Sequence, residues 1–173
     1  VSASETITYT NNSPDTLRYL WLQLDQNRFS NESLERRTET AVDAAGRATW
    51  KEAGTDVLTY NTIARHQLGK DVAYGYTIER VADARGRPLP HTIVDTMMRV
   101  DLPRPLRSGQ QVTFSVDWSF NVLNEPRVGS RGGYEHFPEN DTYIFFLAQW
   151  FPRMAAYTDY AGWQHKAFLG RGE

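Results

Sequence analysis

The expected fold rests on one apolar run, Tyr143-Ile144-Phe145-Phe146-Leu147-Ala148-Gln149-Trp150-Phe151-Pro152-Arg153-Met154, which one amide interrupts and one proline closes. From position 143 to position 150 the run holds no Gly or Pro, and it lacks the strict alternation of a half-exposed strand. Aromatic and β-branched residues at its start favour a strand. The run therefore predicts a central strand that is buried on both faces.

Gln149 is the polar exception in this run. Its amide carries two donors and an acceptor oxygen, and burying them without partners costs roughly 1–3 kcal/mol. The amide is therefore expected either to be hydrogen-bonded inside the core, as most buried polar groups are, or to face a ligand. The residues by themselves leave both interpretations open.

Length, composition and charge restrict the class of protein. The chain has 173 residues, of which 40% are hydrophobic and 13% aromatic, so it can bury one sizeable core and is expected to form one domain. Its net charge is −2 and its basic residues are scattered, which excludes an electrostatic footprint for nucleic acid or an anionic membrane. No apolar run is long enough to span a bilayer, and the first residues lack the pattern of a signal peptide. These residues do not distinguish a cytoplasmic from an exported protein.

Further strands are predicted in the first two thirds of the chain. Segments 5–10 and 17–24 flank the turn-forming residues 11–15 and predict a β-hairpin. The second arm carries apolar residues on both faces, so it is expected to lie inside a sheet. Segments 74–81 and 91–102 predict another hairpin or a meander.

The best-oriented strand is predicted over residues 111–122, which alternate strictly. Six of its side chains are expected to face the core: Val112, Phe114, Val116, Trp118, Phe120 and Val122. Residues 103–109 before it are expected to form a turn, because two prolines there stop ladder pairing. Residues 123–141 after it predict a long functional or mobile connection. Residues 30–70 are irregular, and no chemistry is assigned to them.

The residues show no catalytic or metal-binding constellation. Cysteine is absent, which excludes disulfides, thiolate metal ligands and a cysteine nucleophile. No two of the four histidines lie three to five residues apart, so the zinc-binding spacing of a His-Glu-x-x-His helix is missing. The chain also lacks a Gly-x-Ser-x-Gly elbow. We therefore expect neither a catalytic residue nor a metal ligand in this chain.

Several segments, taken in their order and spacing, carry a resemblance to a known family. They are residues 8–17 leading into 20–24, residues 106–114, and residues 149–157 followed by 162–173. Together they resemble the amino-terminal domain of bacterial aminopeptidase N-like zinc metallopeptidases, which are gluzincins. The similarity covers most of the chain.

The resemblance implies an all-β fold, a sandwich or saddle-shaped assembly of mostly antiparallel sheets with long loops. In that family this domain precedes a thermolysin-like catalytic domain, which supplies the zinc ligands, the general-base Glu and a Gly-x-Met-x-Asn motif. None of these motifs is present here. Residues 1–173 are thus expected to be a single non-catalytic front domain of a longer chain. Its partners would be the catalytic domain, where zinc is expected, and a peptide substrate.

The resemblance also assigns a role to one residue. The family's front domain commonly lends a Gln to the pocket for the substrate's first residue, and Gln149 occupies the matching place. The family's Phe-Pro-Cys-Phe-Asp-Glu-Pro stretch has only a loose counterpart here, in residues 156–162. The alternative hypothesis is a free-standing β-sandwich that binds carbohydrate or protein, and the residues encoded after Glu173 would distinguish the two.

Overall fold

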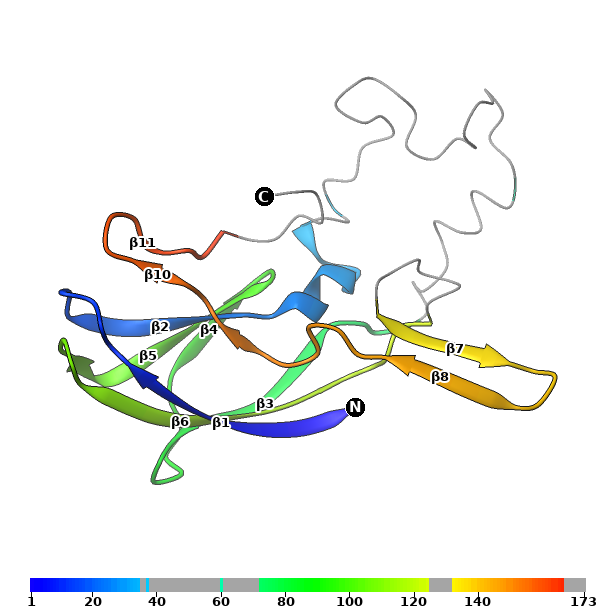
Figure 1. The fold of residues 1–173 in the computed structure, drawn as a ribbon, viewed down its shortest axis with the longest axis horizontal. Helices are drawn as coiled ribbons and strands as arrows, with labels where there is room; N and C mark the ends of the chain where they lie inside the picture. The colour runs from blue at the N-terminus through cyan, green and yellow to red at the C-terminus, as the bar shows by residue number, and fades with distance from the viewer. Residues whose placement is uncertain (35–36, 38–59, 61–71, 125–131, 167–173) are drawn as a thin grey trace, which may run out of the picture.

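The structure, a computed structural model, describes residues 1–34, 37, 60, 72–124 and 132–166 (Figure 1). In these residues the chain is all-β, with antiparallel sheets and one 3-10 helix, η1 (Asp25–Phe29). The two larger sheets share one hydrophobic core, as the layers of a sandwich do. The expected fold class is therefore confirmed. Within the described ranges, no helix has the length and apolar character needed to cross a membrane.

The first sheet has three strands in the order β1-β6-β3. They are β1 (Ser2–Thr10), β6 (Gln111–Phe120) and β3 (Tyr76–Asp83). The central strand, β6, buries Phe114, Val116 and Trp118 almost completely, whereas the residues between them stay partly exposed. The alternation predicted for residues 111–122 is thus confirmed as far as Phe120, where the strand ends.

The second sheet has four strands in the order β4-β5-β2-β9. They are β4 (His91–Val94), β5 (Met97–Leu106), β2 (Leu17–Gln23) and β9 (Arg153–Met154). The prediction that the 17–24 segment lies inside a sheet is confirmed, because β2 pairs with β5 on one side and β9 on the other. Leu20 and Leu22 of β2 are fully buried against the first sheet's core residues.

The predicted hairpin between residues 5–10 and 17–24 does not form, because β1 and β2 belong to different sheets. Residues 11–15 carry the chain from one sheet to the other. Asn11, which is fully buried, holds this crossing: its amide group donates to the carbonyls of Asp15 and Leu106, and its Oδ1 accepts from Ser13. Residues 11–15 do turn the chain, but turn-forming residues suit a crossing between two sheets as well as a hairpin.

Two further expectations for the middle of the chain need correction. Segment 91–102 is two paired strands, β4 and β5, because Asp95 has a φ of 52° and reverses the chain. The predicted turn at 103–109 starts later, since β5 continues through both prolines to Leu106. The pairing of β4 with β5 ends at Val100, before the two prolines. Their missing N–H groups are therefore tolerated at this end of β5.

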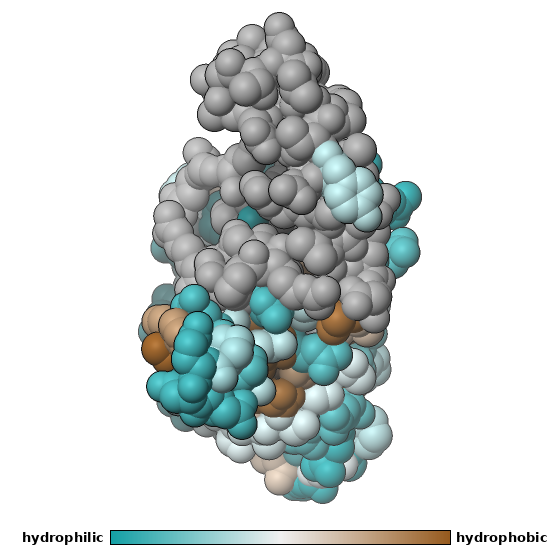
Figure 2. Space-filling model, turned by 90° about the vertical axis from the view of Figure 1, so that its right-hand side faces the viewer, coloured by the Kyte–Doolittle hydropathy of each residue, from teal (hydrophilic) through white to brown (hydrophobic). Residues whose placement is uncertain are grey.

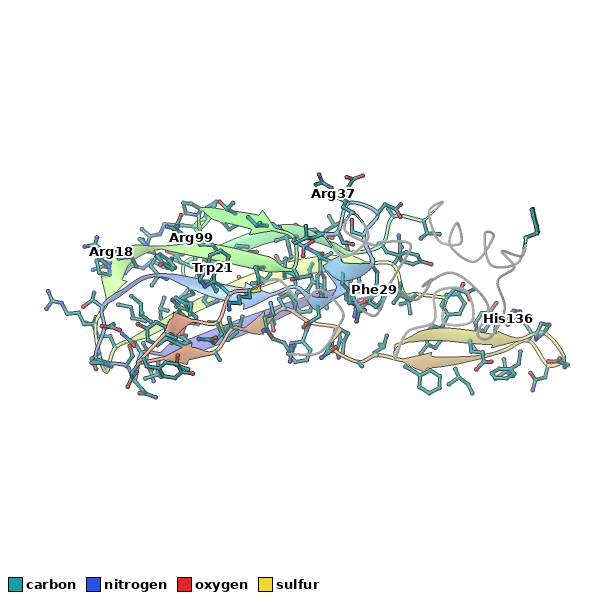
Figure 3. The ribbon with its side chains drawn as sticks, turned by 90° about the horizontal axis from the view of Figure 1, so that it is seen from above. Arg18, Trp21, Phe29, Arg37, Arg99 and His136 are labelled. Carbon is teal, nitrogen blue, oxygen red and sulfur yellow. The ribbon has the colours of Figure 1, made fainter. Side chains whose placement is uncertain are left out.

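The largest error concerns the apolar run at residues 143–150. Its strand, β8 (Thr142–Phe146), is not central: among the described strands it pairs only with β7 (Gly133–Phe137), which lies inside the connection predicted at 123–141. All five residues of β8 are exposed. In Figure 1 this hairpin projects from one end of the sandwich, and in Figure 3 the labelled His136 lies on it, far from the core. Residues 125–131 of that connection lie outside the described residues.

Two short strands complete the described fold. They are β10 (Tyr157–Thr158) and β11 (Gly162–Trp163). Trp163 packs its ring against Tyr9 of the first sheet, with 5.8 Å between the ring centroids, and against Tyr157. The segment after the apolar run is thereby fixed onto the sandwich.

Candidate functional site

The residue singled out by the sequence, Gln149, lies in a bend between the exposed hairpin and the sandwich. It follows β8 by three residues, it is exposed, and its backbone adopts a φ of 50°. A residue other than glycine in this left-handed region is uncommon, and such a conformation persists only where its surroundings hold it. The expectation that Gln149 ends a buried strand is therefore wrong. Its side-chain amide makes no hydrogen bond within the described residues.

Hydrogen bonds from two elements hold the backbone of this bend. The amide nitrogen of Gln26, from η1, donates to the carbonyls of Ala148 at 3.3 Å and Gln149 at 3.1 Å. The Tyr76 hydroxyl, at the start of β3, donates to the Gln149 carbonyl at 3.3 Å. Gln26 is only 8% exposed, so its amide is itself held in place. The bend thus presents the Gln149 side chain outward from a fixed backbone.

Aromatic packing and an ion pair fix the chain directly after Gln149. Trp150 packs against Trp118 of β6, with 6.2 Å between the ring centroids, and Pro152 is buried. Arg153 then donates from Nε and Nη2 to Oδ2 of Asp25, at 2.9 and 2.8 Å. The chain after the bend is therefore tied to β6 and to η1.

A polar cluster lies beneath the bend. Burial and then the nearby carboxylates of Asp25 and Glu5 raise the pKa of Tyr76, while Arg153 opposes them. Burial also raises the pKa of Glu5 to about 7. In the described residues, Glu5 Oε1 and Trp118 Nε1 are buried without a hydrogen-bond partner. Uncompensated buried polar atoms of this kind destabilise a fold unless something satisfies them.

Sequence reasoning missed this cluster. One signal was available: in β1 the inward-facing positions are Ala3, Glu5, Ile7 and Tyr9, so Glu5 stands in an otherwise apolar series. For Gln26 and Tyr76 the sequence offers no comparable signal, since their role depends on the backbone of a bend that lies more than 70 residues away.

The hairpin beside Gln149 carries a face of aromatic rings. The paired residues Tyr134 and Phe145, and the next pair His136 and Tyr143, lie on the same face. The His136 and Tyr143 rings stack at 4.3 Å, and Tyr134 contacts both Tyr143 and Phe145 at about 6 Å. Phe145 is 59% exposed. Figure 2 views this end of the molecule and shows hydrophobic residues at the surface among hydrophilic ones.

The opposite face of the hairpin is also partly apolar, with Ile144 and Phe146 exposed. Large apolar residues therefore lie open to solvent on both faces of β8. A two-stranded hairpin without cover is marginally stable in water, and clustered exposed apolar side chains mark contact surfaces.

The groups at this site can bind a ligand by hydrogen bonding and by apolar contact. Gln149 is a neutral donor and acceptor, suited to positioning a ligand. In the described residues, no three His, Cys, Asp or Glu side chains gather as a metal site requires. His136 pairs with Asp141 at 2.9 Å, and His165 stacks on Trp21 with 5.0 Å between ring centroids.

Comparisons with family models, curated proteins and solved structures find no match for the chain.

Proposed function

We propose that this chain is a non-catalytic front domain of an aminopeptidase N-like zinc metallopeptidase. In this proposal the β7–β8 hairpin packs against the catalytic domain, and Gln149 lines the substrate cleft between the two. The observation that carries the proposal is the position of Gln149: an exposed side chain on a backbone held by hydrogen bonds, at the base of a hairpin with exposed apolar residues.

The proposed role of Gln149 follows from its chemistry. An amide exchanges no proton near neutral pH, so it would act by hydrogen-bonding the free amine or the neighbouring backbone of a peptide substrate. Two hydrogen bonds to its carbonyl hold the backbone, which reduces the ordering needed when a substrate binds. Gln149 would therefore be a positioning residue.

The first test is the reading frame beyond Glu173. The proposal requires a His-Glu-x-x-His helix and a Gly-x-Met-x-Asn motif in the residues that follow, since these supply zinc ligands, base and amine recognition in the family it resembles. A continuing frame that lacks these motifs, or a stop codon in their place, contradicts the proposal.

The second test uses the complete protein. Gln149→Ala should lower kcat/KM for aminoacyl substrates by about 10- to 100-fold, which corresponds to about 1.4–2.7 kcal/mol of transition-state stabilisation. The melting temperature should change little, because the Gln149 side chain is exposed. Gln111→Ala is the matched control: this glutamine is also exposed, and it lies at the start of β6, far from the hairpin. Unchanged kcat/KM in Gln149→Ala would overturn its assignment to the cleft.

The aromatic face supports a second candidate function, a free-standing β-sandwich module that binds carbohydrate. Exposed aromatic rings provide apolar surface with polar edges, which suits the faces of sugar rings. In that case Tyr143→Ala should abolish retention of the chain on an oligosaccharide array, and Gln149→Ala should leave it unchanged. If the unsubstituted chain is not retained on the array, this candidate is excluded.

A further inference from the structure

A second candidate site lies away from the hairpin, in a groove of about 530 Å³. Three parts of the chain line it: the turn after β3, the proline-containing end of β5 and the beginning of β6. In Figure 1 the connection from β5 to β6 lies at the end of the sandwich opposite the hairpin. The groove therefore shares no residue with the Gln149 site, and an inference from it does not depend on the proposed function.

The groove carries an excess of positive charge. Arg85, Arg87 and Arg104 line it together with one carboxylate, Asp83. Within the described residues, the guanidinium groups of Arg85 and Arg104 have no hydrogen bond or ion pair. Two exposed arginines of one groove thus lack a counter-charge.

Asp83 does not neutralise these two arginines, because its acceptor positions are already used. Its Oδ1 accepts from the backbone N–H groups of Arg85 and Arg87, at 2.9 and 3.0 Å. Its Oδ2 accepts from Nε and Nη2 of Arg87, at 2.8 and 2.7 Å. A carboxylate has about four acceptor sites. These bonds also hold the pKa of Asp83 below its usual value, so it stays ionised and fixes the turn that carries Arg85.

The other residues of the groove limit the kind of ligand that it can bind. Pro103 and Pro105 have no backbone N–H, so the end of β5 is poorly suited to accept an added peptide strand. Gln110 accepts from the backbone of Arg107 through Oε1, which leaves its NH₂ group as a donor for a ligand. The groove therefore combines two free guanidinium groups with an amide donor.

We propose that this groove binds a phosphate or sulfate monoester of a sugar-sized molecule. Guanidinium groups match such oxyanions because they donate two parallel hydrogen bonds to them. The volume falls in the usual range for small-molecule sites and exceeds what a bare ion needs. The amide donor of Gln110 would serve the hydroxyl groups of the ester.

Isothermal titration calorimetry at low salt tests this proposal. The probes are glucose 6-phosphate, glucose 6-sulfate and the inorganic phosphate and sulfate ions, each against the 173-residue chain. We expect at least one ester to bind, and to bind more tightly than either inorganic ion. Binding of the phosphate ester alone, or of the sulfate ester alone, identifies which group the site takes. Absence of ester binding up to about 10 mM, far above the range of specific sites, would overturn the proposal; so would an ester that binds no better than its inorganic ion.

Two substitutions locate the site. Arg85→Gln and Arg104→Gln should each weaken ester binding about tenfold, since each removes a charge-assisted hydrogen bond. Both side chains are exposed, so the melting temperature should not change. Lys166→Gln is the control, because it removes one exposed positive charge from outside the groove. An equal loss in Lys166→Gln would show general charge attraction and overturn the assignment to the groove.

Discussion

Strands β6 and β8 are both rich in aromatic and β-branched residues, yet their surroundings are opposite. β6 has a strand on each side and the second sheet across the core, and it buries Phe114 and Trp118 almost completely. β8 has one partner strand, and all of its residues are exposed. In β6 the apolar residues alternate with polar ones, whereas in β8 they are continuous. An alternating pattern specifies which face of a strand is buried. A continuous apolar run indicates only that both faces are apolar, and it does not specify what buries them.

The difference between the two strands implies different sources of stability. The apolar surface of β6 is covered by the chain itself. The apolar side chains of β8 are 42–59% exposed, so they add less to the folding free energy of the 173-residue chain than those of β6. Three experiments test this comparison.

The largest expected effect comes from the centre of the sandwich. Trp118→Ala should lower the free energy of unfolding by about 3–5 kcal/mol, because it removes a ring that is 2% exposed and that packs on Trp150. Phe145→Ala, on the exposed face of β8, should change it by less than about 0.5 kcal/mol. Urea titration of both variants measures this difference. Similar losses would show that the hairpin is covered in solution by the chain itself.

An intermediate effect is expected where the hairpin joins the sandwich. Gly133 has a φ of 147°, and a Cβ there would lie 2.5 Å from the carbonyl oxygen of Leu123. Gly133→Ala should therefore cost about 2–4 kcal/mol, from backbone strain plus a clash against a buried segment. Gly109→Ala is the control, since its φ is also positive but its Cβ would meet nothing within 4 Å; it should cost about 1 kcal/mol. If urea titration gives equal losses for Gly133→Ala and Gly109→Ala, the backbone at the junction shifts enough to relieve the clash.

The smallest effect is a pH dependence that involves Glu5. Burial raises its pKa to about 7 in the folded chain from an ordinary value of 4.5, so between these pH values the folded state binds more protons than the unfolded one. Stability from this group is therefore complete at low pH and is lost as the pH rises through 7. Glu5→Gln, which stays neutral, should raise the melting temperature at pH 8 and change it little at pH 4. A shift that is the same at both pH values would show that the carboxyl is ionised throughout or fully solvated.

Much of the sandwich could be predicted from the sequence, because periodicity reports local environment. Residues 111–120 alternate and form the central strand of the first sheet, and residues 17–24 contain the interior strand β2. Which strands pair could not be predicted, since β1 and β2 are neighbours in sequence but lie in different sheets. Gln149 was found as a polar exception, but its exposure was not, because the absence of cover on β8 depends on contacts far apart in the chain.

The pairing of β1 with β6 has a consequence for the newly made chain. β1 ends at Thr10, and its only partner strand in the described sheets is completed at Phe120. At about 5–20 residues per second, a ribosome needs roughly 5–20 s to make the residues between them. During that time both edges of β1 are unpaired, and either can associate with other chains. Its alternating Ser and Thr residues on the outer face, at positions 2, 4, 6 and 8, keep one side of that waiting strand hydrophilic.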